Sequence, residues 1–397
     1  MQMQVLLNDV TVGVLTRAPD ERVEFVLRRE YIEMHPRPVL GQQFEDDPQG
    51  RWASKVTLPP FFSNLLPEGK LRDYVSHLAG VRREREFFLL GFLGLDLPGA
   101  VQVVESDPVQ LDLPEDNDAE AHDQVAGEKQ MKFSLAGVQL KLSALREGRG
   151  LTIPVEGRGG NWIVKLPDPR FPRVPRTEWS TMHWAQRAGL PVPRIELVSL
   201  SDIHGLPDDA YTGKEDKAYA IERFDRSKRG RIHTEDFAQV LGVRPAAKYE
   251  NANYETIARN VLAIAGVEAF LRFVRQLVFV ILSGNGDAHL KNWSLIYRDG
   301  VRADLAPPYD LVSTILYNPK DTLGLNLAKN KAFERVTIAD FERLAQKIGA
   351  DPKVVTGAAS DAATMTRDAW NAVRDEVSLA NDSKAAIQAH LDRVPLK

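Results

Sequence analysis

An aspartate and an asparagine of the segment SGNGDAHLKN, residues 283–292, have the residue types and spacing for phosphoryl transfer. Asp287 and Asn292 form the pattern D-x-x-x-x-N directly after an apolar, helix-like stretch. In protein kinases this spacing defines the catalytic loop, where the Asp accepts the proton of the attacking hydroxyl and the Asn holds a metal ion. Phosphoryl transfer needs both groups, because a carboxylate must stand beside the hydroxyl and an oxygen ligand must hold Mg²⁺ nearby.

A second carboxylate follows the loop at the place where kinases have their main metal ligand. Two aspartates are candidates, Asp304 and Asp310. Asp304 comes shortly after the turn signal Asp299-Gly300, so we expect it on an exposed strand. Asp310 lies beyond that strand, after Pro307-Pro308 and Tyr309, and we prefer it as the metal ligand.

The strand-rich part before the loop must supply a nucleotide site. Lys165 stands within the apolar run NWIVKLP, where a lysine is costly unless it is paired. Glu178, at the start of the next helical pattern, is the natural partner, as in the lysine–glutamate pair of kinases. The last strand of this part runs into IERFDR, where a kinase has the hinge that binds adenine.

The phosphate-binding loop is the least marked feature, because neither G-x-G-x-x-G nor a Walker A sequence is present. The best candidate is the segment SLAGVQLK, residues 134–141. Its small residues Ala136 and Gly137 let backbone N–H groups approach phosphates.

Each of these features also has a purely structural interpretation. Gly-Asn-Gly-Asp is a common surface turn, and His289 alone is more often a packed or capping histidine than a ligand. Asp310 can cap a helix, and Lys165 can extend its ammonium to solvent from a strand end. The prediction of phosphoryl transfer depends on their occurrence together and in this order.

Composition is that of an ordinary globular protein, with 43% hydrophobic and 27% charged residues in 397. A net charge of −4 gives no global positive field for nucleic acid or anionic lipid, although a local basic patch is compatible with it. The absence of cysteine excludes disulfides and cysteine chemistry. The N-terminus lacks the basic and apolar regions of a signal peptide, and no apolar run is long enough to span a bilayer, so we expect a cytoplasmic protein without membrane contact.

The pattern along the chain predicts an α+β protein in which a strand-rich half precedes a helix-rich half. Residues 3–16 alternate around Asn8-Asp9 as a hairpin, and residues 105–130 are acidic and linker-like. Helical spacing marks residues 177–188, 255–265, 269–282 and 338–348, and returns across 360–395. We expect a small N-terminal module over residues 1–105, a region with the phosphate loop and hinge over 106–230, and a helical region with the catalytic loop over 231–397.

Taken together, these blocks resemble the HipA family, kinases of type II toxin–antitoxin systems. The resembling segments are FSLAGVQLK (133–141), IVKLP (163–167), IERFDR (221–226), GDAHLKN (286–292), Tyr309-Asp310, VGVL (12–15) and FSNLLP (62–67). The resemblance covers most of the chain. It implies a bilobed protein-kinase-like fold with an added N-terminal module. It also implies a kinase that phosphorylates Ser or Thr with ATP and Mg²⁺.

The resemblance also implies a role for each matching residue. Asp287 is the base, Asn292 and Asp310 hold Mg²⁺, and Ser134 is the site of autophosphorylation that disables the phosphate loop. The expected nucleotide-binding residues are Ala136, Gly137, Val138, Gln139, Leu140, Lys141, Lys165, Glu222, Arg223, Phe224, His289, Leu290, Lys291, Asn292, Tyr309 and Asp310. Two departures are Tyr309-Asp310-Leu311 in place of Asp-Phe-Gly, and the apolar Leu140 where some relatives carry a charge.

The implied partners are a HipB-like helix-turn-helix antitoxin, operator DNA reached through that antitoxin, and a protein substrate such as an aminoacyl-tRNA synthetase. Two other functions remain open. Small-molecule phosphotransferases share the D-x-x-x-x-N loop, but the serine beside the phosphate loop favours a protein kinase. The other is a catalytically silent corepressor. Against it stands the presence of all four residues that catalysis would need, Lys165, Asp287, Asn292 and Asp310.

Overall fold

A computed structural model describes residues 1–106, 139–148, 150–154, 159–206, 210–211 and 213–397. The N-terminal module contains one antiparallel sheet of order β4-β3-β2-β1-β5. Its strands are β1 (Gln2–Leu7), β2 (Val10–Arg17), β3 (Arg22–Leu27), β4 (Trp52–Lys55) and β5 (Val101–Glu105). The predicted hairpin is present, and Asn8 and Asp9 form its turn with φ of 46° and 68°, a backbone conformation that these two residue types tolerate.

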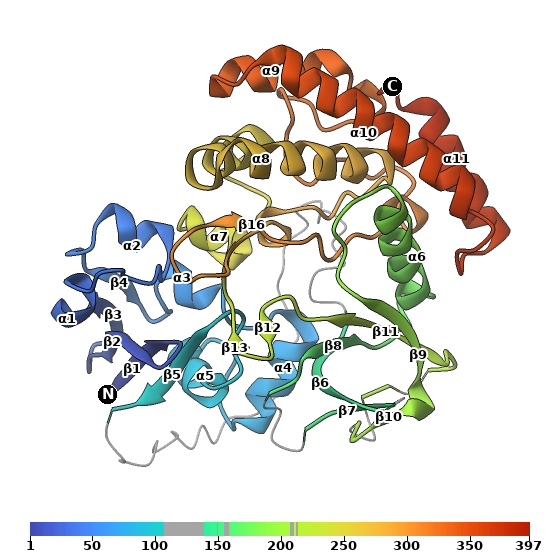
Figure 1. Cartoon of the computed structure of the whole chain (residues 1–397). Helices are drawn as coiled ribbons and strands as arrows, with labels where there is room; N and C mark the ends of the chain where they lie inside the picture. Colours follow the sequence, from blue (N-terminus) through green and yellow to red (C-terminus); the bar gives the residue numbers. More distant parts are fainter. Residues whose placement is uncertain (107–138, 149, 155–158, 207–209, 212) are drawn as a thin grey trace.

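Short helices complete the module: α1 (Arg29–Ile32), α2 (Gln42–Asp46), α3 (Pro60–Ser63), α4 (Gly69–Leu78) and α5 (Glu86–Leu93). Their apolar faces pack on the sheet around an aromatic cluster in which Phe44 lies edge-on to both Phe25 and Phe61, with ring centroids 5.2 and 4.9 Å apart. This core is distinct from that of the helical lobe, to which only Val39 of the module's buried residues belongs. The module is thus a compact unit that lies beside both of the other parts (Figure 1).

A second, six-stranded sheet of order β10-β7-β6-β8-β11-β9 forms the strand-rich lobe. Its strands are β6 (Lys141–Glu147), β7 (Gly150–Thr152), β8 (Trp162–Lys165), β9 (Ile195–Ser199), β10 (Ile203–His204) and β11 (Lys217–Glu222). The helix α6 (Val174–Arg187) packs against β9 and β11 and begins three residues before the predicted position, because Pro175 is tolerated in a first turn. In the register of the sheet, Lys165 faces Lys141 on one side and Tyr219 on the other.

The helical lobe contains a small sheet and five helices. A short hairpin, β12 (Arg226–Ser227) and β13 (Gly230–Arg231), leads into it. Its sheet has the order β14 (His233–Asp236), β15 (Ser294–Tyr297), β16 (Asp304–Leu305). The helices are α7 (Phe237–Val240), α8 (Tyr254–Leu282), α9 (Ile338–Ile348), α10 (Pro352–Val373) and α11 (Asn381–Arg393). Single 3₁₀ turns in this lobe are η2 (Pro245–Ala247), η3 (Leu290–Asn292), η4 (Thr314–Leu316) and η5 (Phe333–Arg335), whereas η1 (Leu200–Asp202) connects β9 and β10 of the strand-rich lobe.

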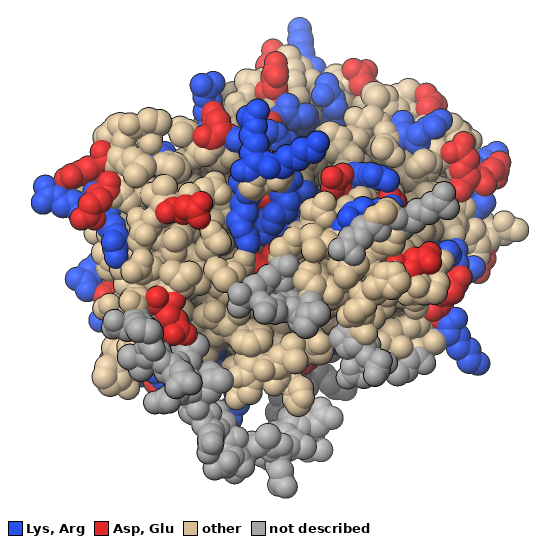
Figure 2. Space-filling view, turned by 60° about the horizontal axis from the view of Figure 1, so that its bottom comes forward, with Lys and Arg blue, Asp and Glu red and all other residues tan. Residues whose placement is uncertain are grey.

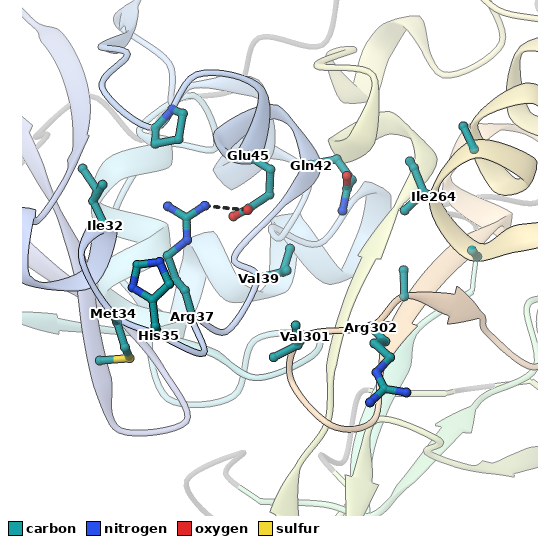
Figure 3. Close-up of a pocket in the computed structure, with 14 residues that line it drawn as sticks. Ile32, Met34, His35, Arg37, Val39, Gln42, Glu45, Ile264, Val301 and Arg302 are labelled. Carbon is teal, nitrogen blue, oxygen red and sulfur yellow. Dashed lines mark hydrogen bonds and ion pairs between the residues drawn. The ribbon is translucent and has the colours of Figure 1, made fainter.

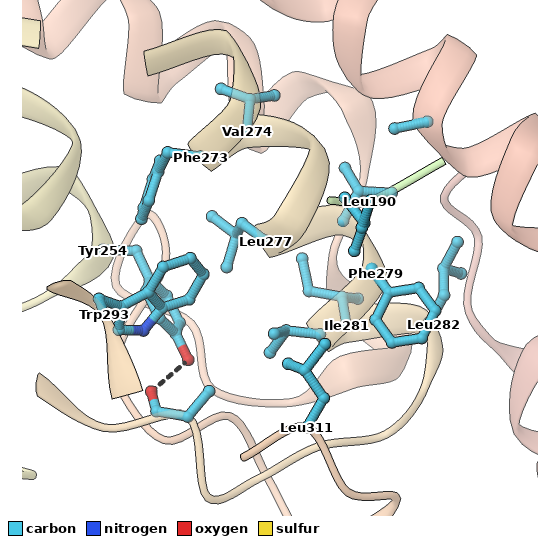
Figure 4. Close-up of a cluster of buried hydrophobic side chains, with 14 of the residues drawn as sticks. Leu190, Tyr254, Phe273, Val274, Leu277, Phe279, Ile281, Leu282, Trp293 and Leu311 are labelled. Carbon is cyan, nitrogen blue, oxygen red and sulfur yellow. Dashed lines mark hydrogen bonds between the residues drawn. The ribbon is translucent and has the colours of Figure 1, made fainter. Parts of the chain in front are cut away.

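Helix α8 is the central element of this lobe. Gly266 interrupts it with φ 82° and ψ −179°, at the break between the two helices that the sequence predicts. After the break, Phe273, Leu277, Phe279 and Leu282 are fully buried and pack among α9, α10 and the following loop (Figure 4). The buried second half of α8 therefore supplies a rigid support for the segment at its end.

The charged side chains are spread over the surface. On the face shown in Figure 2, acidic and basic side chains are interspersed, with one gathering of Lys and Arg near the middle. The net charge of −4 thus conceals local basic regions. In the part of the chain that the structure describes, no helix combines the length and apolarity that crossing a bilayer requires.

Candidate active site

The predicted catalytic loop follows α8 directly and is held by the segment 313–324. Gly284 has φ 63°, a left-handed conformation that suits glycine. The N–H of Gly286 donates to Thr314 Oγ1 at 2.7 Å, and Thr314 in turn donates to Asp321. A Cβ atom on Gly286 would lie 2.1 Å from Asp321 Oδ2, so only glycine fits without a shift. The loop is therefore fixed by close packing as well as by hydrogen bonds.

Asp287 is almost fully buried in this loop. Its N–H donates to Asn285 Oδ1 at 3.0 Å, and its Oδ1 accepts a hydrogen bond from the Tyr249 hydroxyl. The N–H of His289 donates to Asn292 Oδ1 at 3.2 Å, which orients the amide of Asn292. The loop thus presents one carboxylate and one amide in fixed positions.

Asp310 lies beside that amide, with its Oδ2 3.5 Å from Asn292 Nδ2. A carboxylate and an amide are hard oxygen ligands of the kind that Mg²⁺ prefers, so the donor set fits the ion. Asp304, the other candidate, lies on β16 as predicted and forms an ion pair with Arg272 of α8. Among the described residues, no group of three or more His, Asp or Glu side chains forms a further candidate metal site.

Lys165 connects the two lobes at this point. Its ammonium forms ion pairs with Glu178 of α6 and with Asp310. Burial alone would lower the pKa of Lys165, but the two carboxylates outweigh it and raise the pKa. Burial is also the main reason why the pKa of Glu178 is raised, against the opposing effect of Lys165. The predicted Lys165–Glu178 pair is therefore present and includes a third, inter-lobe member.

Lys141 provides a second cation on the neighbouring strand. Its Nζ lies 3.0 Å from Asp310 Oδ2. Burial alone would raise the pKa of Asp310, but Lys141 and Lys165 together hold it well below its usual range. The backbone of Asp310, two residues after Pro308, has φ 53°. In this conformation its carboxylate faces the two lysines. Two ammonium groups thus converge on the carboxylate of Asp310.

His289 is buried with both ring nitrogens lacking a hydrogen-bond partner among the residues that the structure covers. Burial, followed by the nearby Lys248, holds the pKa of His289 well below its usual range. Its ring lies edge-on to Tyr249, with centroids 4.9 Å apart. The imidazole is therefore neutral.

The residues predicted for the hinge lie at the end of β11. Glu222 is exposed, and the ring of Phe224 packs on Tyr309 with centroids 5.5 Å apart. The Arg223 side chain instead binds Asp225 and Asp96, the latter from the N-terminal module. A nucleotide contact of Arg223 would therefore have to come from its backbone.

Two loop residues have side chains engaged elsewhere. Leu290 is completely buried in the core of the helical lobe. Lys291 forms an ion pair with Glu68 of the N-terminal module, at 2.8 Å. Their predicted nucleotide contacts stay predictions, and any such contact of Leu290 would be through its backbone.

The predicted phosphate loop is described only at its end. Ser134, Ala136, Gly137 and Val138 lie outside the described residues. Gln139 is buried, and its Nε2 donates to the carbonyl oxygen of Leu166 at 3.3 Å. Leu140 is half-buried, and its carbonyl oxygen accepts from the N–H of Leu166 at 3.0 Å. These bonds join the loop's end to the strand of Lys165.

A separate groove of about 990 Å³ lies between the N-terminal module and the helical lobe (Figure 3). Module residues such as Ile32, Met34 and Arg37 form one wall, and Ile264 and Val301 of the helical lobe face them. None of the residues discussed above as catalytic or nucleotide-binding candidates lines it. We therefore do not assign this groove to the candidate active site.

Comparison with known proteins agrees with this geometry. A family model of the HipA-like C-terminal domain matches residues 133–370, and one of the HipA N-terminal domain matches residues 3–104. Protein Y4dM of Sinorhizobium fredii is 42% identical over 404 residues, covering 99% of this chain and 97% of that protein. The serine/threonine-protein kinase toxin HipA of Shewanella oneidensis is 29% identical over 294 residues, covering 65% of this chain and 63% of the toxin.

Among solved structures, the complex of Shewanella oneidensis HipA with HipB and its operator DNA has a matching chain. Its TM-score is 0.76 at 21% identity, covering 99% of this chain and 95% of that one. The α+β fold is thus the bilobed, protein-kinase-like fold that the sequence predicts. The chain belongs to the HipA family.

Proposed function

We propose that the chain is a serine/threonine protein kinase that uses ATP and Mg²⁺ and acts as the toxin of a toxin–antitoxin system. The observation that carries the proposal is the contact of Lys165 with both Glu178 and Asp310. Kinases need this lysine–glutamate pair and the metal-binding aspartate to be in place at the same time. Asp287 and Asn292, in the adjacent loop, supply the remaining parts.

The roles follow from position and charge. Asp287 would orient the attacking hydroxyl and accept its proton as the bond to phosphorus forms. Lys141 and Lys165 would bind phosphate oxygens, because their ammonium groups converge on one point of the cleft. Asn292 and Asp310 would hold Mg²⁺, which neutralises charge on the transferred phosphoryl group.

The regulation and partners are proposed from the family. Phosphorylation of Ser134, seven positions before Lys141 in the chain, would place about −1.5 to −2 charges near the phosphate site and oppose nucleotide binding. The Shewanella oneidensis structure contains HipA, HipB and operator DNA. By that likeness, this chain would bind a helix-turn-helix antitoxin and reach operator DNA through it. A translation protein such as an aminoacyl-tRNA synthetase is the proposed substrate, and the cytoplasm the proposed location.

Controlled expression tests the proposal. The wild type and Asp287→Ala would be induced separately, each with and without the candidate antitoxin, and serine and threonine phosphorylation compared across the proteome. We expect the wild type alone to arrest growth and to add phosphate to host proteins, with relief by the antitoxin. Equal arrest by Asp287→Ala, or phosphate found only on small molecules, would contradict the proposal.

A further inference from the structure

The N-terminal module reaches the candidate catalytic loop through residues 64–68, the connection between α3 and α4. This connection overlaps the segment FSNLLP that resembles the family's N-terminal module. Glu68 Oε1 lies 2.8 Å from Lys291 Nζ, and Glu68 Oε2 lies 2.5 Å from Lys248 Nζ. Lys291 Nζ also donates to the carbonyl oxygen of Asn64 at 3.1 Å. One carboxylate of the module thus bridges two lysines of the helical lobe.

Lys291 is joined to the metal-binding side of the site. It directly precedes Asn292 in the chain. Its carbonyl oxygen accepts a hydrogen bond from the Tyr309 hydroxyl at 2.8 Å, and Tyr309 directly precedes Asp310. A shift of Lys291 would therefore move the two residues that fit Mg²⁺.

Lys248 is joined to the side of the proposed base. Its carbonyl oxygen accepts from the N–H of Leu290, within the loop, at 3.2 Å. The next residue, Tyr249, donates its hydroxyl to Asp287. Glu68 therefore links the segment that contacts Asp287 to the segment that contains Asn292.

The bridge is protected from solvent. The side chains of Lys248 and Lys291 are only 9% and 14% exposed, and that of Glu68 is 26% exposed. Salt screens such partly buried charges far less than surface pairs. Burial alone would raise the pKa of Glu68, but Lys291 and Lys248 outweigh it and lower the pKa to about 2. The carboxylate is thus ionised at any pH at which a kinase is assayed.

We infer that Glu68 is a positioning residue for phosphoryl transfer, and that the N-terminal module thereby forms part of the active site. The inference rests on the proposed kinase function. Because transfer requires the reacting groups in near-attack geometry, a displacement of about 1 Å can cost about a hundredfold in rate. Removing the charge of Glu68 breaks both ion pairs and leaves Lys291 with its hydrogen bond to Asn64, so the loop and the Tyr249 segment are no longer held to one carboxylate.

A matched control is available in Glu24. This carboxylate also pairs with two cations, Arg22 and Arg51, but both belong to the module and neither contacts the loop. Its side chain is 17% exposed, similar to Glu68. Glu24→Gln and Glu68→Gln therefore remove equal charge from the same module, and only one of them affects the bridge.

The experiment measures phosphoryl transfer, ATP dissociation constant and thermal unfolding of full-length wild type, Glu68→Gln and Glu24→Gln. We expect Glu68→Gln to lower kcat roughly 10- to 100-fold while the ATP dissociation constant changes little. Glu24→Gln should keep the wild-type kcat. The single variant Lys291→Met and the double variant Glu68→Gln with Lys291→Met are measured in parallel. The double variant should be no slower than the slower of the two single variants, because each substitution alone already breaks the Glu68–Lys291 ion pair.

The outcomes are distinguishable. Equal kcat for Glu68→Gln and Glu24→Gln in an active wild type would overturn the inference and leave the kinase function intact. A loss of kcat in Glu68→Gln that tracks a loss of folded protein would also overturn it, since the contact would then only stabilise the fold. An inactive wild type would instead count against the proposed function.

Discussion

Lys165 on β8 of the strand-rich lobe forms an ion pair with Asp310 of the helical lobe. The two residues come from different lobes of the fold, and both are members of the predicted site. Their contact fixes the lobes at the point where phosphate and metal would be bound.

Lys165→Met should reduce ATP binding and destabilise the fold. The variant leaves Glu178, which is 3% exposed, without its cation. Breaking a buried pair in this way costs about 3–5 kcal/mol. Since the pKa of Glu178 is already raised by burial, the cost should shrink as the pH falls and the carboxyl takes up a proton. Urea unfolding at several pH values and ATP titration would measure both effects.

Lys70→Met is the control for that variant. Lys70 pairs with Asp168, but its side chain is 47% exposed and Arg170 also binds Asp168. Because Lys70 is half exposed and Arg170 stays bound to the buried Asp168, loss of this pair should cost less than about 1 kcal/mol. Equal destabilisation by the two substitutions would contradict a special role for the buried Lys165 pair.

Glu235 should make the protein less stable as the pH rises. It is buried between the module and the helical lobe, where its carboxylate accepts hydrogen bonds from the Tyr297 hydroxyl and the N–H of Gln42. Burial raises its pKa from 4.5 to about 8. The folded protein therefore keeps a proton that the unfolded chain loses. The stability that Glu235 contributes is fully present below about pH 4.5. It declines by a few kcal/mol as the pH rises to about 8.

Glu235→Gln should flatten this dependence between pH 6 and 8, because glutamine has no proton to lose. Below that range two groups act in opposite directions: burial raises the pKa of Asp236 to about 6 and lowers that of His233 to about 4, so the comparison is made above pH 6. Urea unfolding from pH 6 to 8 measures the slope in wild type and variant. A slope unchanged between pH 6 and 8 in the variant would show that Glu235 does not carry it.

Gly286→Ala should displace the catalytic loop. The added Cβ would lie 2.1 Å from Asp321 Oδ2 and 2.6 Å from the carbonyl oxygen of Thr322. Overpacking of this kind costs about 1–3 kcal/mol, and a loop shift of about 1 Å would lower kcat about a hundredfold. Steady-state kinetics and thermal unfolding would measure these effects.

Gly357→Ala is the matched control, since no neighbouring atom lies within 4 Å of a Cβ at this exposed position in α10. It should leave kcat unchanged and stabilise the fold by up to about 1 kcal/mol through helix propensity. If Gly286→Ala behaved like Gly357→Ala, the packing around the loop would not be what positions it.

Local patterns were enough to predict the main elements and the ends of several helices. Helix α9 begins and ends as its apolar spacing predicts, and the break in α8 falls at Gly266. Asp287, Asn292 and Asp310 are close in sequence, so their spacing was enough to predict that they lie together. The sheet β14-β15-β16 was not predicted as a sheet, because strands of two to four residues leave too short an alternation to recognise.

The sequence pattern did not reveal which distant segments of the chain contact one another. Lys141 was predicted as part of a phosphate loop but not as a partner of Asp310, which lies 169 residues away. Tyr249 and Glu68 stand in segments whose patterns reveal only a turn or a loop, yet they contact Asp287 and Lys291. The packing of the module on the helical lobe brings Glu68 to the site, whereas Lys141 reaches Asp310 from the strand-rich lobe and Tyr249 reaches Asp287 from within the helical lobe.

The most direct test of the account is to incubate the purified protein with Mg-ATP and map the added phosphate by mass spectrometry, with Asp287→Ala in parallel. We predict phosphate on Ser134 in the wild type and none in the variant, although the variant still binds ATP. Phosphate on Ser134 in Asp287→Ala at the wild-type rate would show that Asp287 is not the base and would contradict the central claim.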